Sequence, residues 1–482
     1  MAISLQATAR RGSFGHVKLN LTVLLSILPL SACVSYAPAP VELSALVADA
    51  RTRALNLGQV RDKVASIAPD ATWSGPRLDR LALFASALLH NPDISASRAG
   101  VDGATAAAKA SRVGPAATLT LSTEYARNAA EISPWLFSGT IDIPLDVGTR
   151  RKARLTSFDL AVDIARYDYA DRIWSVRVAV RRALADYFIA ERQAVAYQRV
   201  AQVRARQQAA MENRVNAGEA SRAELERVRA DGADAVRRTA DAVNSSRSSL
   251  QSLATALGVS VEALSDVTFS WIDFDKPAGD PGMGVTDEVR AAATLSRADV
   301  LKAVVAYDQT EADLRVEVAR QYPAISIAPG YTWERGLVKI PVSLGLVLPP
   351  LDLNRGAIAT AQARRTEAGR KLEAVVAASQ AAVDLALAET RAAREALRQV
   401  RSVELVAAGR LSAQADRELA QGAIDRTDWA AAQAGAGLAR ISELDALARV
   451  HAADAGLEDA LRRPLEGPET MILPSPAARS HP

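Results

Sequence analysis

The sequence predicts an α+β fold in which long helices and membrane-length strands occur in two successive copies of one unit. Alternating apolar and polar residues mark four strands of about ten residues each. Helical patterns between them continue for far longer than a globular domain allows. Matching features recur at nearly constant spacing: helix starts at Asp93 and Asp299 lie 206 residues apart, and turns at Gly218 and Gly422 lie 204 apart. A period of this length indicates a duplicated half and excludes a solenoid repeat.

The composition narrows the class of protein. Of 482 residues, 49% are apolar, 23% are charged, 5% are aromatic and one is cysteine. The charge content excludes a polytopic helical membrane protein, and the apolar fraction excludes a disordered chain. A single cysteine excludes a disulfide framework and a multi-cysteine metal site. Abundant alanine favours long helices that pack closely side by side.

The basic isoelectric point, about 9.0, originates at the N-terminus. The formal net charge is +3, and residues 1–32 contain Arg10, Arg11 and Lys18 but no acidic residue, so the remainder of the chain is neutral. A neutral mature chain gives no reason to expect nucleic acid as a partner.

Residues 1–32 resemble a secretory signal peptide. A basic start is followed by an apolar core at 19–30, which is too short to span a bilayer. The run Leu30-Ser31-Ala32-Cys33 resembles a bacterial lipobox, which implies that Cys33 becomes the lipidated first residue of the mature chain. The alternative is an ordinary signal peptide followed by an incidental buried cysteine.

The four predicted strands form two hairpins, at 115–146 and 322–350. In the second strand, for example, Ile141 and Ile143 flank Asp142. Strands of this length cross an outer membrane when they are tilted. Five aromatic residues fall toward the hairpin tips, where an interfacial aromatic girdle would lie: Tyr125, Trp135, Phe137, Tyr331 and Trp333.

Four strands cannot close a transmembrane barrel, because about eight is the smallest number that closes. The alternative is one face of a soluble β-sandwich, but two hairpins separated by a long helical region supply too few strands for it. Three copies of the chain would supply twelve strands and leave no open edge. The strands therefore predict a homotrimer around a twelve-stranded barrel.

The helical pattern at 150–218 contains no proline and no internal glycine before the final turn. At 1.5 Å per residue it predicts a helix of about 100 Å, which needs a bundle or a helical barrel. A second uninterrupted helix is expected at 355–422. Apolar residues of the first helix step by three and four, as in a coiled coil: Tyr169, Ile173, Val176, Val180, Leu184 and Tyr187.

The expected segments follow in order along the chain. They are a signal peptide (1–32), a lipid-anchored segment (33–75), short helices (76–114), a hairpin (115–146), a long helical hairpin (150–258), a linker (259–283), short helices (284–321), a second hairpin (322–350), a second long helical hairpin (355–463) and a disordered tail (464–482).

Together these segments resemble the TolC family of outer-membrane efflux channels. The resemblance covers roughly residues 75–463 and rests on four motifs: the Asn91-Pro92-Asp93 helix start, the junction Ile143-Pro144-Leu145-Asp146 with Arg150 and Arg151, its twin Leu348-Pro349-Pro350-Leu351-Asp352 with Arg355, and the turns at Gly218 and Gly422. It implies a homotrimer whose barrel sits in outer-membrane lipid and continues as a helical barrel of twelve staves across the periplasm. It also implies a periplasmic adaptor (a membrane fusion protein) and an inner-membrane pump of the RND type as partners.

In such a family the turns at Gly218 and Gly422 mark the periplasmic tip, where adaptor hairpins dock and the pore closes. Ser221 with Glu224 forms a capping box, and Asp425 with Asp428 forms a similar pair, so helix capping alone is the alternative role for these residues. The resemblance implies that Asp428 contributes to an acidic ring that favours cations. The family's next acidic position is Ala431 here, which argues against a double ring. Arg426 either forms a salt bridge between protomers or is solvated.

The sequence contains no constellation typical of an enzyme. The four histidines are scattered, and neither a phosphate-binding loop nor a nucleophile motif is present. We therefore expect no catalysis, no cofactor and no bound metal. A periplasmic coiled-coil lipoprotein, acting as an adaptor or a spacer, is the alternative to a channel. The stretch 147–152 resembles, faintly, the heavy-metal cation branch of the family, and drug or solvent export remain alternatives.

Overall fold

The structure is a computed structural model of the 482-residue chain. It describes residues 36–472 except 72, 74, 76, 128–132, 147, 278, 280 and 335. The expected signal peptide, the lipidation site Cys33 and the last part of the expected tail (473–482) therefore lie outside the described residues. The chain divides into two compact units, residues 1–49 and 50–482. Helix α1 (Leu43–Thr52), which begins in the first unit, buries none of its residues.

The second unit begins with three short helices, α2 (Leu57–Ile67), α3 (Arg80–His90) and α4 (Pro92–Ser111). The side chain of Asn91 accepts hydrogen bonds from the backbone N–H groups of Asp93 and Ile94, and Pro92 occupies the first turn of α4. This cap confirms the helix start predicted at Asn91-Pro92-Asp93, because proline tolerates the first helical position and asparagine satisfies the free donors there.

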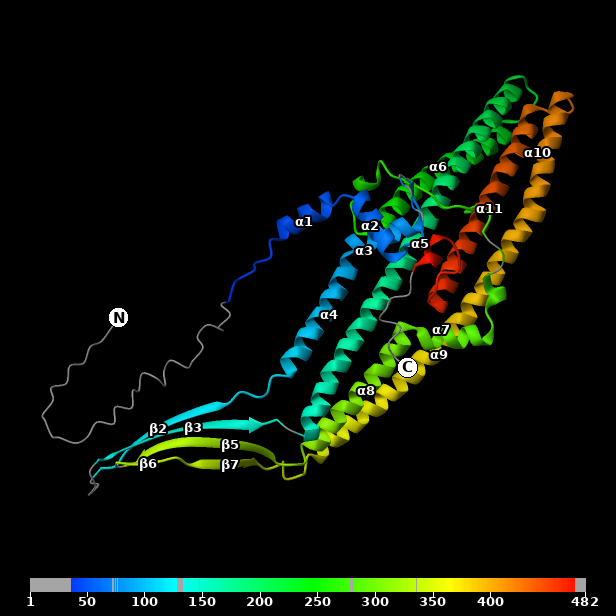
Figure 1. Cartoon of the computed structure of the whole chain (residues 1–482). Helices are drawn as coiled ribbons and strands as arrows, with labels where there is room; N and C mark the ends of the chain where they lie inside the picture. The colour runs from blue at the N-terminus through cyan, green and yellow to red at the C-terminus, as the bar shows by residue number, and fades with distance from the viewer. Residues whose placement is uncertain are drawn as a thin grey trace. The chain divides into compact units, whose positions relative to one another are not determined.

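The predicted hairpins come together in one antiparallel sheet (Figure 1). Strand β2 (Thr118–Tyr125) pairs with β3 (Trp135–Leu145), and β3 pairs with β5 (Ala324–Glu334). The opposite side of β5 pairs with β6 (Leu337–Lys339) and β7 (Val342–Val347). The β3–β5 pairing joins the two halves of the duplicated chain, and it was not part of the sequence prediction.

The last strand is interrupted, whereas the sequence predicted one continuous strand as the second arm of the hairpin at 322–350. The break falls at Ile340 and Pro341, between β6 and β7. The register on β5 is the same on both sides of the break, since Thr332 faces Lys339 and Pro329 faces Val342. Proline has no backbone N–H, so it removes one ladder bond without shifting the strand. Its carbonyl still accepts from the N–H of Gly330, at 2.8 Å.

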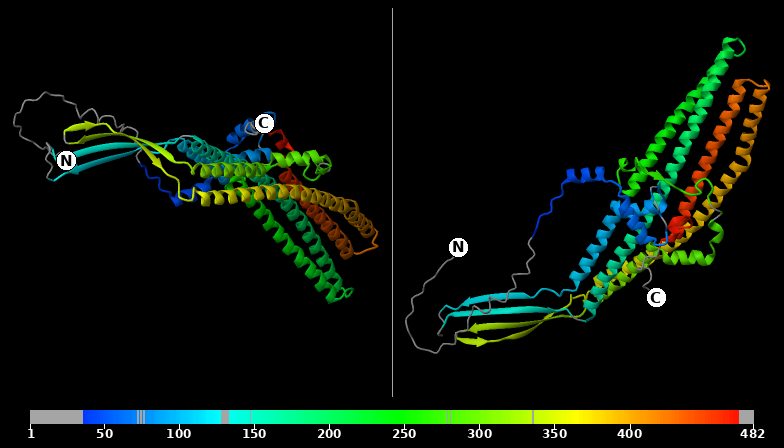
Figure 2. Two further views of the ribbon diagram at one scale, coloured as in Figure 1. Left: turned by 90° about the horizontal axis from the view of Figure 1, so that it is seen from below. Right: turned by 45° about the horizontal axis from the view of Figure 1, so that its top comes forward.

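Two long helical hairpins extend from the sheet (Figures 1 and 2). The first consists of α5 (Gly148–Asn216) and α6 (Arg222–Leu257). Short helices α7 (Asp287–Ser296) and α8 (Ala298–Ala319) precede the strands of the second half. The second hairpin consists of α9 (Arg355–Gln399), a π-helix at Val400–Glu404, α10 (Leu405–Ala420) and α11 (Arg426–Leu461).

The π-helix corrects the prediction of an unbroken second helix at 355–422. Its backbone hydrogen bonds join residues five apart, so it inserts one extra residue into the helix. Arg401 lies in this turn and donates from Nε to Glu443 of α11 at 2.8 Å, and from Nη2 to the carbonyl of Asp275 at 2.5 Å. These two bonds hold the turn against α11 and the linker between the halves.

The largest apolar cluster lies where α3, α5 and α6 meet. Five of the six residues predicted as a coiled-coil face of α5 belong to it: Tyr169, Ile173, Val176, Val180 and Leu184. Gly258, the left-handed C-cap of α6, approaches the corner between α3 and α4 so closely that a Cβ would lie 2.5 Å from the carbonyl oxygen of His90. A side chain at this position would therefore clash with the backbone of the corner.

The linker contains short elements of structure, and the described part of the tail is more ordered than predicted. β1 (Arg77–Leu78) and β4 (Thr268–Phe269) form a short parallel pair, and short 3₁₀ turns occur at Glu262–Leu264 and Pro281–Gly284. The tail forms a further 3₁₀ turn at Pro468–Met471. Residues 464–472 are therefore ordered, with Glu469 buried and Glu466 paired with Arg80.

Candidate functional site

The outer face of the sheet is apolar and uncovered in the single chain. In β3 the apolar residues Trp135, Phe137, Ile141 and Ile143 are exposed, whereas Ser138 and Asp142 are half-buried. Strands β5 and β7 continue the pattern, with exposed Ile325, Ile327, Leu344 and Leu346. An apolar face of this size is unusual for a monomer in water and marks a surface made for lipid or for another protein.

Four of the five aromatic residues predicted as a girdle form one row across three strands. The ring centroids of Tyr125 and Trp135 lie 4.9 Å apart, those of Trp135 and Phe137 6.0 Å, and those of Phe137 and Trp333 5.9 Å. Tyr331 is exposed and faces Gly139 across β3 and β5. The row lies toward the ends of the strands that are farthest from the helices.

The first hairpin turn is capped as the sequence predicted. Gly218 has a φ of 76°, a left-handed conformation that closes the turn at the end of α5. The Ser221 hydroxyl accepts from the N–H of Glu224, and the Glu224 carboxylate accepts from the N–H of Ser221 at 2.8 Å. The Ser221 N–H and hydroxyl both donate to the Glu224 carboxylate, and these two bonds lower the pKa of Glu224 because they favour its charged form.

The second hairpin turn differs from the predicted pair of acidic caps. Gly422 has a φ of 70°, and Asp425 accepts from the N–H groups of Thr427 and Asp428 at 2.7 and 2.9 Å. The reciprocal bond from the Asp428 carboxylate is absent among the described residues, so no capping box forms. Aspartate is one carbon shorter than the glutamate that normally reaches back in such a box.

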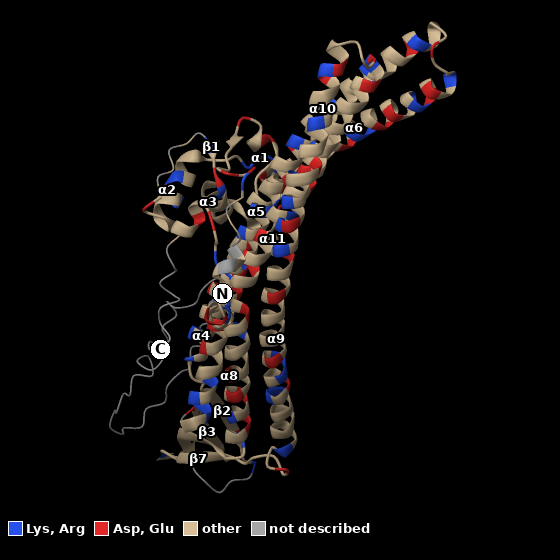
Figure 3. Ribbon diagram, turned by 90° about the vertical axis from the view of Figure 1, so that its right-hand side faces the viewer, with Lys and Arg blue, Asp and Glu red and all other residues tan. Residues whose placement is uncertain are grey.

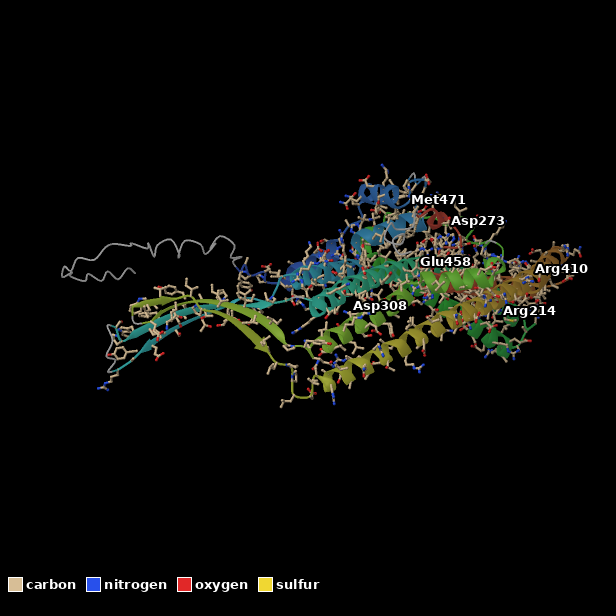
Figure 4. All side chains as sticks on the ribbon, turned by 60° about the horizontal axis from the view of Figure 1, so that its bottom comes forward. Arg214, Asp273, Asp308, Arg410, Glu458 and Met471 are labelled. Atoms are coloured by element: carbon tan, nitrogen blue, oxygen red, sulfur yellow. The ribbon has the colours of Figure 1, made fainter. Side chains whose placement is uncertain are left out.

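Asp425 has a second partner that the sequence did not suggest. Arg214, in the last turn of α5, donates from Nη1 to Asp425 Oδ2 at 2.5 Å. This ion pair links the tips of the two helical hairpins, and each of its side chains is about one-third exposed (35% and 36%). Figure 4 shows Arg214 toward the end of the helices that lies far from the strands. Arg426 and Asp428 are exposed, and neither has an ion pair within the described part of the chain.

A buried ion cluster lies in the middle of the helices. Arg177 donates from Nη2 to Glu458 at 2.8 Å and to Glu469 at 3.2 Å, and Arg181 pairs with Glu458. Arg80 is also buried and lies 3.6 Å from Glu469. Helices α3, α5 and α11 and the tail therefore meet at this cluster, and Glu458 marks its position in Figure 4.

The cluster's carboxyl groups have opposite pKa shifts. Burial alone would raise the pKa of Glu458, but Arg181 and Arg177 beside it hold that pKa below its usual value. Burial raises the pKa of Glu469, since desolvation outweighs its attraction to Arg177 and Arg80. Glu469, from the C-terminal segment, is thus the carboxylate whose charged form is less well stabilised in the cluster than that of Glu458.

His451 lies beside this cluster, at the edge of a cavity of about 520 Å³ that Trp73 and Trp271 also line. Its ring stacks on Phe274 with centroids 4.2 Å apart, and its Nε2 lies 2.9 Å from the Phe274 carbonyl oxygen. Burial lowers the pKa of His451 from 6.5 to about 4. The ring is therefore neutral over the physiological range.

The described residues offer neither a metal site nor a helical membrane span. They contain no group of three or more His, Cys, Asp or Glu side chains that could hold a metal ion. Among them, no helix combines the length and the apolar character that a membrane span requires.

Comparison with solved structures defines the class of fold. A membrane protein from Pseudomonas aeruginosa aligns with a TM-score of 0.67 and 18% identity over 89% of this chain and 96% of its own. The outer membrane protein VceC from Vibrio cholerae aligns at 0.65 and 14% over 79% and 95%. The MtrE outer membrane channel of Neisseria gonorrhoeae aligns at 0.65 and 17% over 82% and 94%. The fold is that of outer-membrane channels with a β domain and a long helical domain.

A family model described as outer membrane efflux protein matches residues 83–259, which contain the first hairpin of strands and the first hairpin of helices. No curated protein matches the chain by sequence. This match and the shared fold support the expected resemblance to TolC-like outer-membrane efflux channels.

Proposed function

We propose that the protein is the exit channel of a tripartite efflux system. Three copies form a twelve-stranded barrel in the outer membrane, and their helical hairpins form a periplasmic duct that meets an adaptor and an RND-type pump. The observation that carries this proposal is the exposed apolar face of the sheet, joined directly to two helical hairpins. A chain with this face needs lipid around its strands and copies of itself at the strand edges β2 and β7.

The dimensions of β3 support the membrane part of the proposal. Eleven residues, Trp135–Leu145, at about 3.4 Å each and a tilt near 45°, span about 25 Å, the height of the apolar band in outer-membrane barrels. Lipidation at Cys33 would add a second attachment to the same membrane.

The tips support the docking part. Gly218 and Gly422 end two hairpins that point the same way in Figures 1 and 2. In the proposed assembly Asp428 lines the pore entrance and favours cations, and the Arg214–Asp425 ion pair holds the two tips of one chain together. Conduction is passive, and the transported substrate is set by the pump.

An adaptor or spacer lipoprotein remains the second candidate. The two helical hairpins and the apolar sheet favour the channel, because a periplasmic protein has no use for a lipid-facing sheet. The discriminating experiment isolates the full-length protein from outer membranes, cross-links it and adds it to planar bilayers. A cross-linked trimer that conducts ions supports the channel. A monomer released from membranes by salt or by lipase, with no conductance, would contradict it.

A further inference from the structure

The helix ends next to the strands form one continuous surface. Helices α4 and α8 end there, and α5 and α9 begin there. Arg151 donates from Nη2 to the carbonyl of Arg112 at 3.2 Å, which places α4 beside α5. Asn354 donates from Nδ2 to the carbonyl of Glu317 at 2.8 Å, which places α8 beside α9. Helix α5 packs along α8, so all four ends lie together.

This surface is strongly basic. Its segments 112–118, 145–155, 317–323 and 348–356 contain seven basic and three acidic residues: Arg112, Arg150, Arg151, Lys152, Arg154, Arg320 and Arg355 against Asp146, Glu317 and Asp352. Each carboxylate is already engaged. Asp146 pairs with Arg151 and Arg154, Glu317 pairs with Arg320, and Asp352 accepts from the N–H of Asn354.

Three cations on this surface, Arg150, Lys152 and Arg355, are exposed and have no ion pair in the part of the chain that the structure describes. We name these three residues the basic collar. They occupy the first turns of α5 and α9, neither of which contains an acidic residue. Cations at a helix N-terminus oppose the helix dipole, so an external anion at the collar would be stabilising. Figure 3 shows Lys and Arg where these helices approach the strands.

The collar borders the apolar face of the sheet. Tyr322, Leu348 and Leu351 lie between the strands and the helices and are 70%, 75% and fully exposed, respectively. An exposed tyrosine and leucines followed at once by unpaired cations form an amphipathic boundary. Such a boundary matches the surface of a lipid leaflet, in which apolar chains end at anionic headgroups.

We propose that the basic collar binds the headgroups of anionic phospholipids in the periplasmic leaflet of the outer membrane. The phosphate oxygens accept hydrogen bonds from the guanidinium and ammonium groups, as they do at other basic sites. The proposal rests on the proposed function, because it requires the strands to span that membrane. In a trimer, three copies of the collar would face one ring of lipid.

The test compares two triple variants with the same change of charge. Arg150→Gln, Lys152→Gln and Arg355→Gln remove the collar. Arg199→Gln, Arg206→Gln and Arg247→Gln are the control, because these arginines are exposed, have no ion pair among the described residues and lie far along α5 and α6.

Each full-length protein is reconstituted in phosphatidylcholine nanodiscs with increasing phosphatidylglycerol, and its thermal midpoint is measured. Phosphatidylglycerol should raise the thermal midpoint of the wild type and of the control. The phosphatidylglycerol fraction that gives half of this rise should be at least tenfold lower for these two proteins than for the collar variant. Each surface cation contributes roughly a fivefold gain in affinity, so tenfold is a conservative threshold. Added salt should weaken the effect.

Inorganic phosphate added to phosphatidylcholine nanodiscs separates a headgroup site from a free-anion site. Equal responses of all three proteins to phosphatidylglycerol, or a full response to inorganic phosphate, would overturn the proposal. Loss of the trimer in the collar variant alone would also overturn it, since the collar would then be a contact between protomers. Failure of the wild type itself to enter nanodiscs, or to conduct in planar bilayers, would instead contradict the proposed function.

Discussion

Arg214 and Asp425 are 211 residues apart in the chain, yet their side chains form an ion pair that joins the tips of the two helical hairpins. Asp425 has two tasks, because the same carboxylate also caps α11. The two tasks can be separated by substitution, since asparagine caps a helix as well as aspartate does but carries no charge.

Arg214→Gln and Asp425→Asn should each increase the leak conductance of the channel in planar bilayers, by similar amounts. The double variant should leak no more than either single variant, because both changes break one interaction. The side chains are partly exposed, so the pair stabilises the tips by about 1 kcal/mol or less. Asp425→Ala should also lower stability by about a further 1 kcal/mol, through the lost cap. Strictly additive leaks would show that the two residues act separately.

Asp428→Ala should enlarge the leak conductance and reduce the preference for cations, because three copies of this carboxylate would lie at one level of the pore. The control is Asp102→Ala, which removes an exposed carboxylate of α4 that has no ion pair among the described residues. Ion selectivity is measured from the reversal potential in a salt gradient. If both variants conduct as the wild type does, Asp428 does not line the pore entrance.

Ile141→Arg should prevent assembly of the trimer in the outer membrane, because an arginine on the lipid face near the membrane centre costs about 2–4 kcal/mol. Thr140→Arg, its neighbour on the half-buried face of β3, should still assemble and should instead shift the channel toward anions. The measurements are the amount of cross-linked trimer in outer membranes and the reversal potential. Equal loss of trimer in both variants would mean that both faces of β3 are packed against protein.

Glu469→Gln should destabilise the protein by about 3 kcal/mol, because it leaves Arg177 and Arg80 buried with one carboxylate fewer. Glu466→Gln should have a smaller effect, since Glu466 is 25% exposed and water can replace it. Denaturant unfolding of the purified protein measures both. A larger loss for Glu466→Gln would show that the buried position of Glu469 is not what fixes the C-terminal segment.

Acidification should destabilise the protein through His451, between pH 6.5 and about 4. The unfolded ring takes up a proton near pH 6.5, whereas burial keeps the folded ring neutral until about pH 4, so stability present above pH 6.5 is lost as the pH falls. The full loss is about 3 kcal/mol per chain. His451→Phe keeps the aromatic stack on Phe274 and cannot titrate, so its unfolding free energy should depend less on pH over this range. An identical pH dependence would exclude His451 as the cause.

Local patterns predicted the strands, the two glycine turns and the coiled-coil face of α5, because each depends on residues close together in the chain. The break between β6 and β7 could have been predicted from Pro341, because proline cannot donate a hydrogen bond to a strand ladder. The π-helix at Val400–Glu404 contains neither proline nor glycine, so its local sequence did not predict it.

The ion pairs were beyond sequence reasoning for a different reason. Arg177 lies 281 residues from Glu458 and 292 from Glu469, and only the meeting of α5, α11 and the C-terminal segment brings them together. A carboxylate near the end of a chain normally predicts a solvated tail. Its burial depends on which arginines the fold places opposite, and helical periodicity contains no information on that.

The π-helical turn limits how far the two halves of the chain are interchangeable. One extra residue rotates every later side chain by about 100° around the helix axis, relative to an unbroken α-helix. Residues 405–420 are therefore rotated relative to the directions that an unbroken helix from Arg355 would give them. Helix α5 has no such turn between Gly148 and Asn216, so the sequences of the two long helices map onto their helix faces in different ways.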